Sequence, residues 1–285
     1  MLATLVSVSE GRVVRVRSRN DVFQLLEALK RSRAKRRRER ACFVESVAAI
    51  DAAIREGWEV LKLVRSAARR PSAWAAGLAD RCPRSLIIEL DDELMAELSD
   101  REETSELVAV VRLPEREPPL PRPSPYAALL LDRPSNPGNL GSALRSADAF
   151  GAAPVLIRGH AADPFDPHCI RSSLGAVFSV PLYAERSNSW LDVWLEELRR
   201  ELPRLQVVGT SPTASLLLPQ VDFRRPTVLV MGNERAGMSE WLRGKLDCSA
   251  AIPCGGRVDS LNLAAATSVA LYELARQRGE VEGRA

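Results

Sequence analysis

Residues 126–152 read YAALLLDRPSNPGNLGSALRSADAFGA and show the unit from which most of this chain is built. The apolar run that ends at Asp132 is typical of a buried β-strand, and the Pro, Gly and Asn residues after it indicate a turn. A helix is predicted to begin near Asn139, because apolar residues recur at helical spacing from there on. Arg145 falls outside that apolar stripe, so it is either an ordinary surface arginine or a residue that binds a phosphate group.

The same alternation of strand and helix continues to the end of the chain. Apolar segments typical of buried strands are predicted at 126–132, 153–159, 180–185, 205–210, 226–232 and 250–255. Near-continuous apolar strands separated by helices favour a parallel sheet that is covered on both faces. Ligands of such sheets bind at the carboxyl ends of the strands, so a site is expected there.

A proline-rich stretch divides the chain. Residues 114–125, PEREPPLPRPSP, hold six prolines in twelve positions, which favours an extended connector. Ahead of it, strands are predicted at 43–46, 58–64, 85–90 and 106–113, with helices at 47–56, 71–81 and 91–99. We therefore expect a smaller α/β domain at 1–113, a linker at 114–125 and a larger α/β domain at 126–285.

Positive charge is concentrated in the first part of the chain. Residues 1–41 hold twelve Lys and Arg residues against four acidic ones, although the net charge of the whole chain is only +3. A basic helix is predicted at about 20–40. Clustered cations gain affinity for polyanions by displacing counterions from phosphates. Contact with nucleic acid through Arg36, Arg37 and Arg38 is therefore favoured over the alternative, a solvated helix face.

The composition argues against several classes of protein. The five cysteines form no CxxC pair and show no regular spacing, so neither a disulfide framework nor a zinc module is predicted. His160 and His168, with two aspartates between them, are interpreted as loop residues and not as metal ligands. No segment is long and apolar enough to span a membrane and no targeting segment is recognisable, so a soluble protein of the reducing cytoplasm is expected.

Two further segments place glycines beside polar residues. VLVMGNERAGMS (228–239) runs from a strand into glycines on either side of Glu234, which lets the backbone approach a ligand closely. AIPCGGRVDSLNLAAATSVALYELAR (251–276) joins a strand, a glycine turn and a helix predicted at 261–276. The structural role that fits Ser260 is the N-cap of that helix, which would leave Asn262 inside the first turn, where asparagine adds little stability.

Together, in this order, the three segments resemble the motifs of the SpoU/TrmH branch of the SPOUT RNA methyltransferases. The resemblance covers 126–285, and the front domain is similar to the L30e/L7Ae-type substrate-binding domain of the avilamycin- and thiostrepton-resistance ribosomal RNA methyltransferases. It implies a trefoil-knotted domain that binds S-adenosylmethionine, a homodimer formed through the C-terminal helix, and methylation of a ribose 2′-hydroxyl in a structured RNA. The periodicity of the sequence does not indicate a knot.

The resemblance also implies roles for individual residues. The family's polar active-site set matches Asn139, Arg145, Glu234, Ser260 and Asn262. The donor pocket is expected to be lined by Thr210, Gly232, Asn233, Glu234, Ile252, Cys254 and Leu261. Arg145 and Arg171 match positions expected to contact RNA. Because a guanidinium keeps its proton, Arg145 is expected to hold a phosphate and stabilise the developing alkoxide, while Ser260 and Asn262 orient the ribose.

Several questions stay open on sequence grounds. Ribosomal 23S RNA is the favoured target and transfer RNA the alternative, and the biological purpose is either ribosome maturation or protection against an antibiotic. A non-catalytic RNA-binding homologue is a rival function, against which the retained polar set argues. A nucleotide-dependent dehydrogenase is disfavoured, because no GxGxxG follows a first strand.

Overall fold

The structure is a computed structural model that describes residues 13–99, 104–114, 126–185, 187–257 and 260–280. The chain divides into two compact units, one within 1–114 together with 165–167, the other within 115–164 and 168–285. Apart from Pro114, the predicted linker at 114–125 lies outside the described residues. In the part of the chain that is described, no helix has the length and apolar character needed to cross a membrane.

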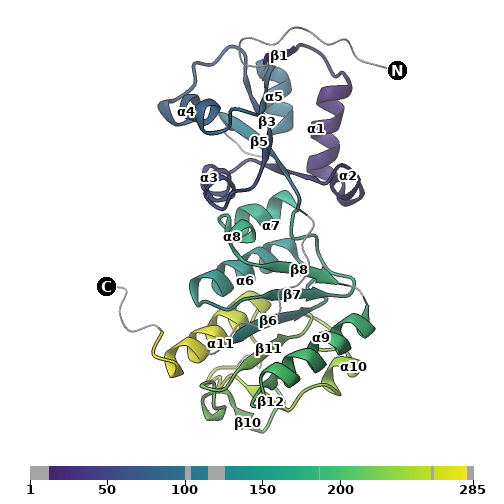
Figure 1. The fold of residues 1–285 in the computed structure, drawn as a ribbon, viewed down its shortest axis with the longest axis vertical. Helices are drawn as coiled ribbons and strands as arrows, with labels where there is room; N and C mark the ends of the chain where they lie inside the picture. The colour runs from purple at the N-terminus through teal and green to yellow at the C-terminus, as the bar shows by residue number, and fades with distance from the viewer. Residues whose placement is uncertain (1–12, 100–103, 115–125, 186, 258–259, 281–285) are drawn as a thin grey trace. The chain divides into compact units, whose positions relative to one another are not determined.

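The first unit is built on a five-stranded mixed sheet (Figure 1). In the order β1-β4-β3-β5-β2, the first three strands are parallel, and β5 is antiparallel to both of its neighbours. The strands are β1 Val13–Val16, β2 Ala41–Val44, β3 Val60–Ser66, β4 Leu86–Leu90 and β5 Leu107–Arg112. The helices are α1 Asp21–Arg31, α2 Arg33–Glu39, α3 Val47–Arg55, α4 Ala73–Arg81 and α5 Asp92–Leu98.

The beginning of this unit differs from the sequence-based expectation. The basic helix predicted at 20–40 is two helices, because Ser32 leaves helical geometry and its hydroxyl caps α2 by accepting a hydrogen bond from the Lys35 amide (3.3 Å). Strand β2 begins at Ala41 and ends at Val44, two residues before the predicted end at 46, since Ser46 caps α3. Strand β1 is not predicted at all, because it is a short edge strand paired only with β4 and carries two exposed valines.

The second unit holds a seven-stranded sheet in the order β10-β12-β9-β11-β6-β7-β8. All of its strand pairs are parallel, which confirms the predicted parallel sheet. The strands are β6 Ala127–Asp132, β7 Val155–Arg158, β8 Leu182–Glu185, β9 Gln206–Thr210, β10 Leu216–Leu217, β11 Thr227–Met231 and β12 Cys248–Ala251. The helices are α6 Pro137–Ala149, α7 Pro167–Ser172, α8 Ala176–Ser179, α9 Asn188–Glu201, η1 Leu218–Gln220, α10 Glu240–Arg243 and α11 Leu263–Gln277.

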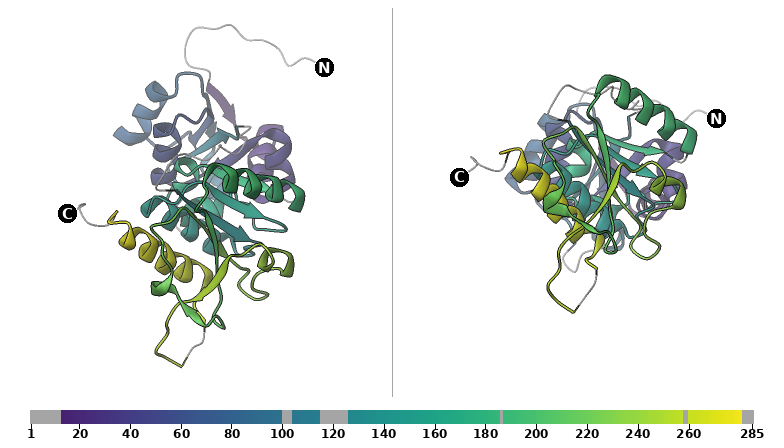
Figure 2. Two further views of the ribbon diagram at one scale, coloured as in Figure 1. Left: turned by 60° about the horizontal axis from the view of Figure 1, so that its bottom comes forward. Right: turned by 90° about the horizontal axis from the view of Figure 1, so that it is seen from below.

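Helices cover both faces of this sheet. Figures 1 and 2 show α6 and α11 side by side on one face and α9 on the other. The α9 face is an apolar core in which Leu191, Trp194 and Leu198 pack against alternate residues of the central strands, among them Leu130 and Val230. Because successive strand residues point to opposite faces, the intervening residues face α6 and α11.

The starts of α6 and α11 are fixed by asparagines. Helix α6 begins at Pro137, two residues before the predicted start, because the Asn136 side chain accepts a hydrogen bond from the Asn139 amide (3.0 Å). Helix α11 begins at Leu263, and the Asn262 side chain caps it by accepting from the amides of Ala264 (2.8 Å) and Ala265 (3.4 Å). The prediction that Ser260 is the N-cap and that Asn262 lies inside the first turn is therefore wrong.

Candidate active site

A pocket of about 330 Å³ opens at the carboxyl ends of three adjacent strands, β9, β11 and β12. Its lining comprises Thr210, Ser211, Pro212, Met231, Gly232, Asn233, Glu234, Arg235, Gly237, Ile252, Cys254, Ser260, Leu261, Leu263 and Ala266. All seven residues predicted to bind the methyl donor are among them. The structure thus brings together side chains from four separate stretches of sequence at the edge where a parallel sheet binds its ligands.

The shape of the pocket is set by a tight turn after β11. Asn233 and Gly237 exchange two backbone hydrogen bonds (3.0 and 2.9 Å), and the Asn233 side chain accepts from the amides of Arg235 (3.0 Å) and Ala236 (2.9 Å). A side chain at Gly232 would place its Cβ 2.5 Å from the Met238 nitrogen. Glycine is therefore required at this position by a close approach of backbone, as the sequence motif suggested.

Three of the predicted catalytic residues form one chain of hydrogen bonds. Asn262 Nδ2 donates to Asn139 Oδ1 (3.0 Å), and Asn139 Nδ2 donates to Glu234 Oε1 (3.1 Å). Glu234 Oε2 also accepts from the amide (3.1 Å) and the hydroxyl (3.0 Å) of Ser135. The carboxylate thereby lies at the N-terminal end of α6, where the helix dipole favours a negative charge.

The surroundings of Glu234 keep it ionised. Partial burial acts to raise its pKa, but the hydrogen bonds from Asn139 and from the amide and hydroxyl of Ser135 outweigh burial and hold the pKa below its ordinary value of 4.5. At neutral pH the group is therefore a carboxylate that ties the loop after β11 to the start of α6. Both of its oxygens accept hydrogen bonds from protein donors.

Arg145 and Ser260 do not join this chain of hydrogen bonds. Arg145 is exposed on α6 and makes no hydrogen bond or ion pair with any residue that the structure describes. It follows Gly141 by one turn on the same helix face. A Cβ at Gly141 would meet the Cys169 carbonyl oxygen of α7. Arg171, half-buried in the last turn of α7, therefore comes from the helix that approaches this face. Ser260 is exposed and lines the pocket.

The three arginines predicted to bind RNA in the basic segment have different environments. Arg37 and Arg38 are exposed, whereas Arg36 is 2% exposed. The Arg36 guanidinium donates to the carbonyl oxygens of Leu29 (2.9 Å) and Lys30 (3.0 Å) and pairs with Asp166 (3.3 Å), which belongs to the same compact unit. The structure contradicts the predicted RNA contact of Arg36, because its side chain is on the inner side of α2 and holds the end of α1.

The side chains that could bind a metal ion are not clustered in the part of the chain that the structure describes. Within the described residues, no group of three or more His, Cys, Asp or Glu side chains is arranged to hold a metal ion. No disulfide joins any of the five cysteines, and Cys254 is exposed at the pocket.

Sequence reasoning missed part of the pocket. Met231, Ser211, Pro212, Arg235 and Gly237 line it without having been predicted. Each lies within three residues of a predicted position, so the signal that could have found them is the continuation of the chain past a strand end. Leu263 and Ala266 belong to the helix predicted at 261–276, and they line the pocket because α11 starts beside it.

Comparisons with known families agree with this arrangement. The sequence profile of the SpoU rRNA methylase family matches residues 126–272, and that of the SpoU L30e-like domain matches residues 20–109. A 23S rRNA (uridine(2479)-2′-O)-methyltransferase from Streptomyces viridochromogenes is 39% identical over 95% of this chain and 94% of its own length. A 23S rRNA (guanosine-2′-O-)-methyltransferase from Pseudomonas aeruginosa is 38% identical over 54% of this chain and 60% of its own length.

Solved structures show the same fold. The SpoU methyltransferase AviRb from Streptomyces viridochromogenes, in complex with the cofactor AdoMet, matches 93% of this chain and all of its own with a TM-score of 0.86 and 38% identity. An AdoMet-bound rRNA methyltransferase from Sinorhizobium meliloti matches 93% of this chain and 98% of its own with a TM-score of 0.80 and 28% identity.

Proposed function

The chain belongs to the SpoU rRNA methylase family, and on that basis we propose that it transfers a methyl group from S-adenosylmethionine to a ribose 2′-hydroxyl of 23S ribosomal RNA. The observation that carries the proposal is the pocket at the ends of β9, β11 and β12, which all seven predicted donor-binding residues line. The non-catalytic rival is disfavoured, because the pocket is open and Asn139, Glu234 and Asn262 are joined beside it.

The pocket fits S-adenosylmethionine in size and in chemistry. Its volume of about 330 Å³ lies at the lower end of small-molecule sites, roughly 300 to 1,000 Å³. Peptide groups at the strand ends can hydrogen-bond an adenine edge and ribose hydroxyls, and the side chains of Ile252, Leu261 and Leu263 can cover the base. Of the charged side chains in the lining, Glu234 is a carboxylate and Arg235 is exposed, so no buried cation opposes a sulfonium.

The reaction needs placement more than acid–base chemistry from the protein. When bound, S-adenosylmethionine supplies a methyl group on a sulfonium, so that an O–CH3 bond forms as the S–CH3 bond breaks and S-adenosylhomocysteine is left. In-line placement of the 2′-oxygen contributes about 7 to 11 kcal/mol when the geometry is good. In this proposal the protein supplies that placement through the rigid join between α6, α11 and the loop after β11.

Arg145 is proposed to hold an RNA phosphate and to stabilise the negative charge that develops on the 2′-oxygen. A guanidinium keeps its proton at neutral pH, so it is not a proton acceptor, and the hydroxyl proton passes to solvent. Asn262 is occupied as a helix cap and as a donor to Asn139. Its role is therefore to fix α11 against α6, and Ser260, at the pocket edge, is the residue proposed to orient the ribose.

Three further parts of the proposal concern assembly, compartment and target. The exposed side chains of Val269 and Tyr272 on α11 support a homodimer in which this helix packs against a second copy. The predicted trefoil knot stays a prediction. None of the five cysteines is in a disulfide, which supports the reducing cytoplasm as the compartment. In the first unit, the exposed Arg37 and Arg38 are proposed to bind RNA phosphates, and in the second unit Arg145 and Arg171 are proposed to do so.

Mapping 2′-O-methyl groups tests the function. Ribosomal and transfer RNA from cells with and without the protein are compared, and the purified protein is given labelled donor with a 23S transcript. We expect one 23S ribose to lose its methyl group without the protein and to regain it in vitro. Transfer to transfer RNA alone would overturn the target, and no transfer from a donor that binds would favour the non-catalytic rival. Growth of the two strains with ribosome-directed antibiotics separates protection from maturation.

A further inference from the structure

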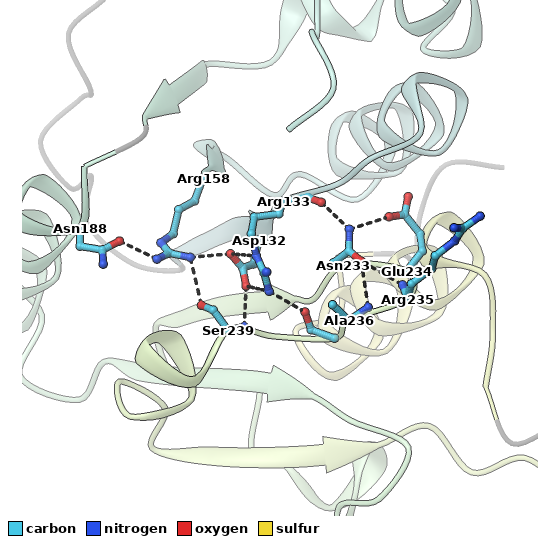
Figure 3. Close-up of polar contacts among 10 residues, drawn as sticks. Asp132, Arg133, Arg158, Asn188, Asn233, Glu234, Arg235, Ala236 and Ser239 are labelled. Carbon is cyan, nitrogen blue, oxygen red and sulfur yellow. Dashed lines mark hydrogen bonds and ion pairs between the residues drawn. The ribbon is translucent and has the colours of Figure 1, made fainter. Parts of the chain in front are cut away.

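Beneath the pocket lies a buried carboxylate that does not line it. Asp132, the last residue of the central strand β6, is fully buried. Its oxygens accept hydrogen bonds from Arg158 (2.6 Å), from the Arg133 side chain (3.2 Å to each oxygen) and from the Ser239 amide (2.7 Å), as Figure 3 shows. Burial acts to raise the pKa of Asp132, but these hydrogen bonds hold the pKa below its ordinary value. The group is therefore an anion inside the protein.

Asp132 and the adjacent Arg133 hold both ends of the loop 233–239, which forms one wall of the pocket. At the N-terminal end of the loop, Asn233 Nδ2 donates to the carbonyl oxygen of Arg133 (2.7 Å). At the C-terminal end of the loop, Arg133 Nη2 donates to the carbonyl oxygen of Gly237 (3.1 Å), and the Ser239 amide donates to Asp132 (2.7 Å). Asn233, Glu234, Arg235 and Gly237 of this loop all line the pocket.

We propose that Asp132 is a positioning residue that holds the loop 233–239 in its donor-binding shape, with Arg133 as the connection to the loop and Arg158 as the second charge partner. The inference rests on the proposed function for the identity of the donor. Asp132 touches neither donor nor RNA in this scheme and acts only through the loop.

Arg158 anchors the same cluster from the other side. It is 9% exposed, donates to Ser239 Oγ (3.0 Å) and to Asn188 Oδ1 (2.5 Å), and lies over the Trp241 ring at 4.6 Å. A buried charge whose partner is removed is costly, because the remaining charge stays desolvated. The Asp132 carboxylate is thus surrounded by groups that keep it charged and in one place.

The backbone conformation of Arg133 is independent evidence that the contacts around it fix its position. Arg133 has φ 56°, in the left-handed region that residues with a side chain rarely adopt. The neighbouring Gly159 leaves room for it, since a Cβ there would lie 2.8 Å from Arg133 Cγ. The conformation turns the Arg133 carbonyl toward Asn233 while its guanidinium reaches Asp132 and Gly237. Unfavourable backbone geometry is kept where surrounding contacts require it.

The test is Asp132→Asn in the full-length protein, read without RNA. Affinity for S-adenosylmethionine is measured by calorimetry, and amide hydrogen exchange is followed at Gly237 and Ser239. We expect binding at least tenfold weaker and faster exchange at both amides, because the variant cannot hold Arg133 and Arg158 as an anion does. In turnover assays, KM for the donor should rise while KM for RNA stays unchanged. The matched control is Leu198→Ala, a fully buried α9 residue whose loss destabilises the apolar core of the same unit and removes none of the hydrogen bonds that hold the loop.

The outcomes separate the two proposals. Donor affinity within twofold of the wild type together with unchanged exchange at the loop would overturn the role of Asp132. Equal loss of donor affinity in Leu198→Ala would also overturn it, since general destabilisation would then account for the effect. If the wild-type protein does not bind the donor, the proposed function is refuted. Amide hydrogen exchange at Gly237 and Ser239 would then still test whether Asp132 holds the loop. If Asp132→Asn does not fold, the same measurements are made on Arg133→Met. Because the Arg133 side chain is one-third exposed, this variant should fold, and it lacks the hydrogen bond to Gly237.

Discussion

The donor pocket and the face of α6 that carries Arg145 differ in how far the protein itself holds their polar groups. In the pocket wall, the side-chain oxygen and nitrogen of Asn233 and both carboxylate oxygens of Glu234 have protein partners. Arg145, six residues beyond Asn139 on the same helix, has no hydrogen bond or ion pair to any described residue. A prearranged wall suits a small ligand that always binds in one way, whereas an uncommitted guanidinium suits a phosphate brought by a large substrate.

The largest effect that separates these regions is expected from Arg145→Ala. Methyl transfer to RNA should fall by at least about 10³-fold, in the range seen when a group that stabilises developing charge is removed. Donor affinity should stay within twofold of the wild type, because Arg145 does not line the pocket. Arg145→Lys should recover little, since lysine lacks the bidentate fork. Arg200→Ala, an exposed arginine on α9, is the control. A parallel loss of donor affinity would show that the two regions are one site.

Gly232→Ala tests the pocket side of the comparison, with the larger effect on donor binding. Its Cβ would lie 2.5 Å from the Met238 nitrogen and 2.6 Å from the Gly237 carbonyl carbon, so the loop after β11 must move. We expect donor affinity to fall about 10- to 100-fold, a change of about 1.4 to 2.8 kcal/mol, by calorimetry. Gly255→Ala should bind normally, because nothing lies within 4 Å of a Cβ there. Normal donor binding by Gly232→Ala would mean that the pocket wall is not held as tightly as its hydrogen bonds indicate.

The basic segment of the first unit offers the same comparison on adjacent residues. Arg36→Met should destabilise the protein by about 2 to 4 kcal/mol, because two buried carbonyl groups lose the donor Arg36 and the ion pair with Asp166 is removed. Replacing the exposed Arg37 and Arg38 with serine should change stability by less than about 0.5 kcal/mol. That double variant should instead lower the slope of log affinity for RNA against log salt by about two. An unchanged slope would show that the segment is not an RNA contact.

Acid titration is expected to give the smallest effect. The folded-state pKa of Glu234 lies below its ordinary value of 4.5, so the stabilisation from its hydrogen bonds is complete above that pH and is lost as the pH falls through the folded pKa. Glu234→Gln should cost about 1 kcal/mol at pH 7, and its difference from the wild type should shrink below pH 4.5. Urea unfolding between pH 3.5 and 7 measures this. A difference that stays constant across that range would mean that the charge of Glu234 does not matter.

The alternation of apolar strands and helices was enough to predict a parallel sheet with helices on both faces, because it depends on residues close together in the chain. The position of the pocket also followed, since glycine-rich turns after β11 and β12 come directly after strands whose ends meet at one edge. Boundaries were less certain where a single side chain decides them. Asn262 and Ser32 cap helices by hydrogen bonds that composition and spacing do not distinguish from other local choices.

Only the tertiary structure decided which charged side chains are used inside the protein. Arg36 and Arg37 are neighbours of the same type, yet packing of α2 buries one and exposes the other. In the sequence, Asp132 is only the last residue of a predicted strand. In the structure it binds Arg158 and Ser239, which lie 26 and 107 residues away in the chain. Periodicity reports which face of an element is buried, but the partner of a buried charge is set by elements distant in sequence that pack against that face.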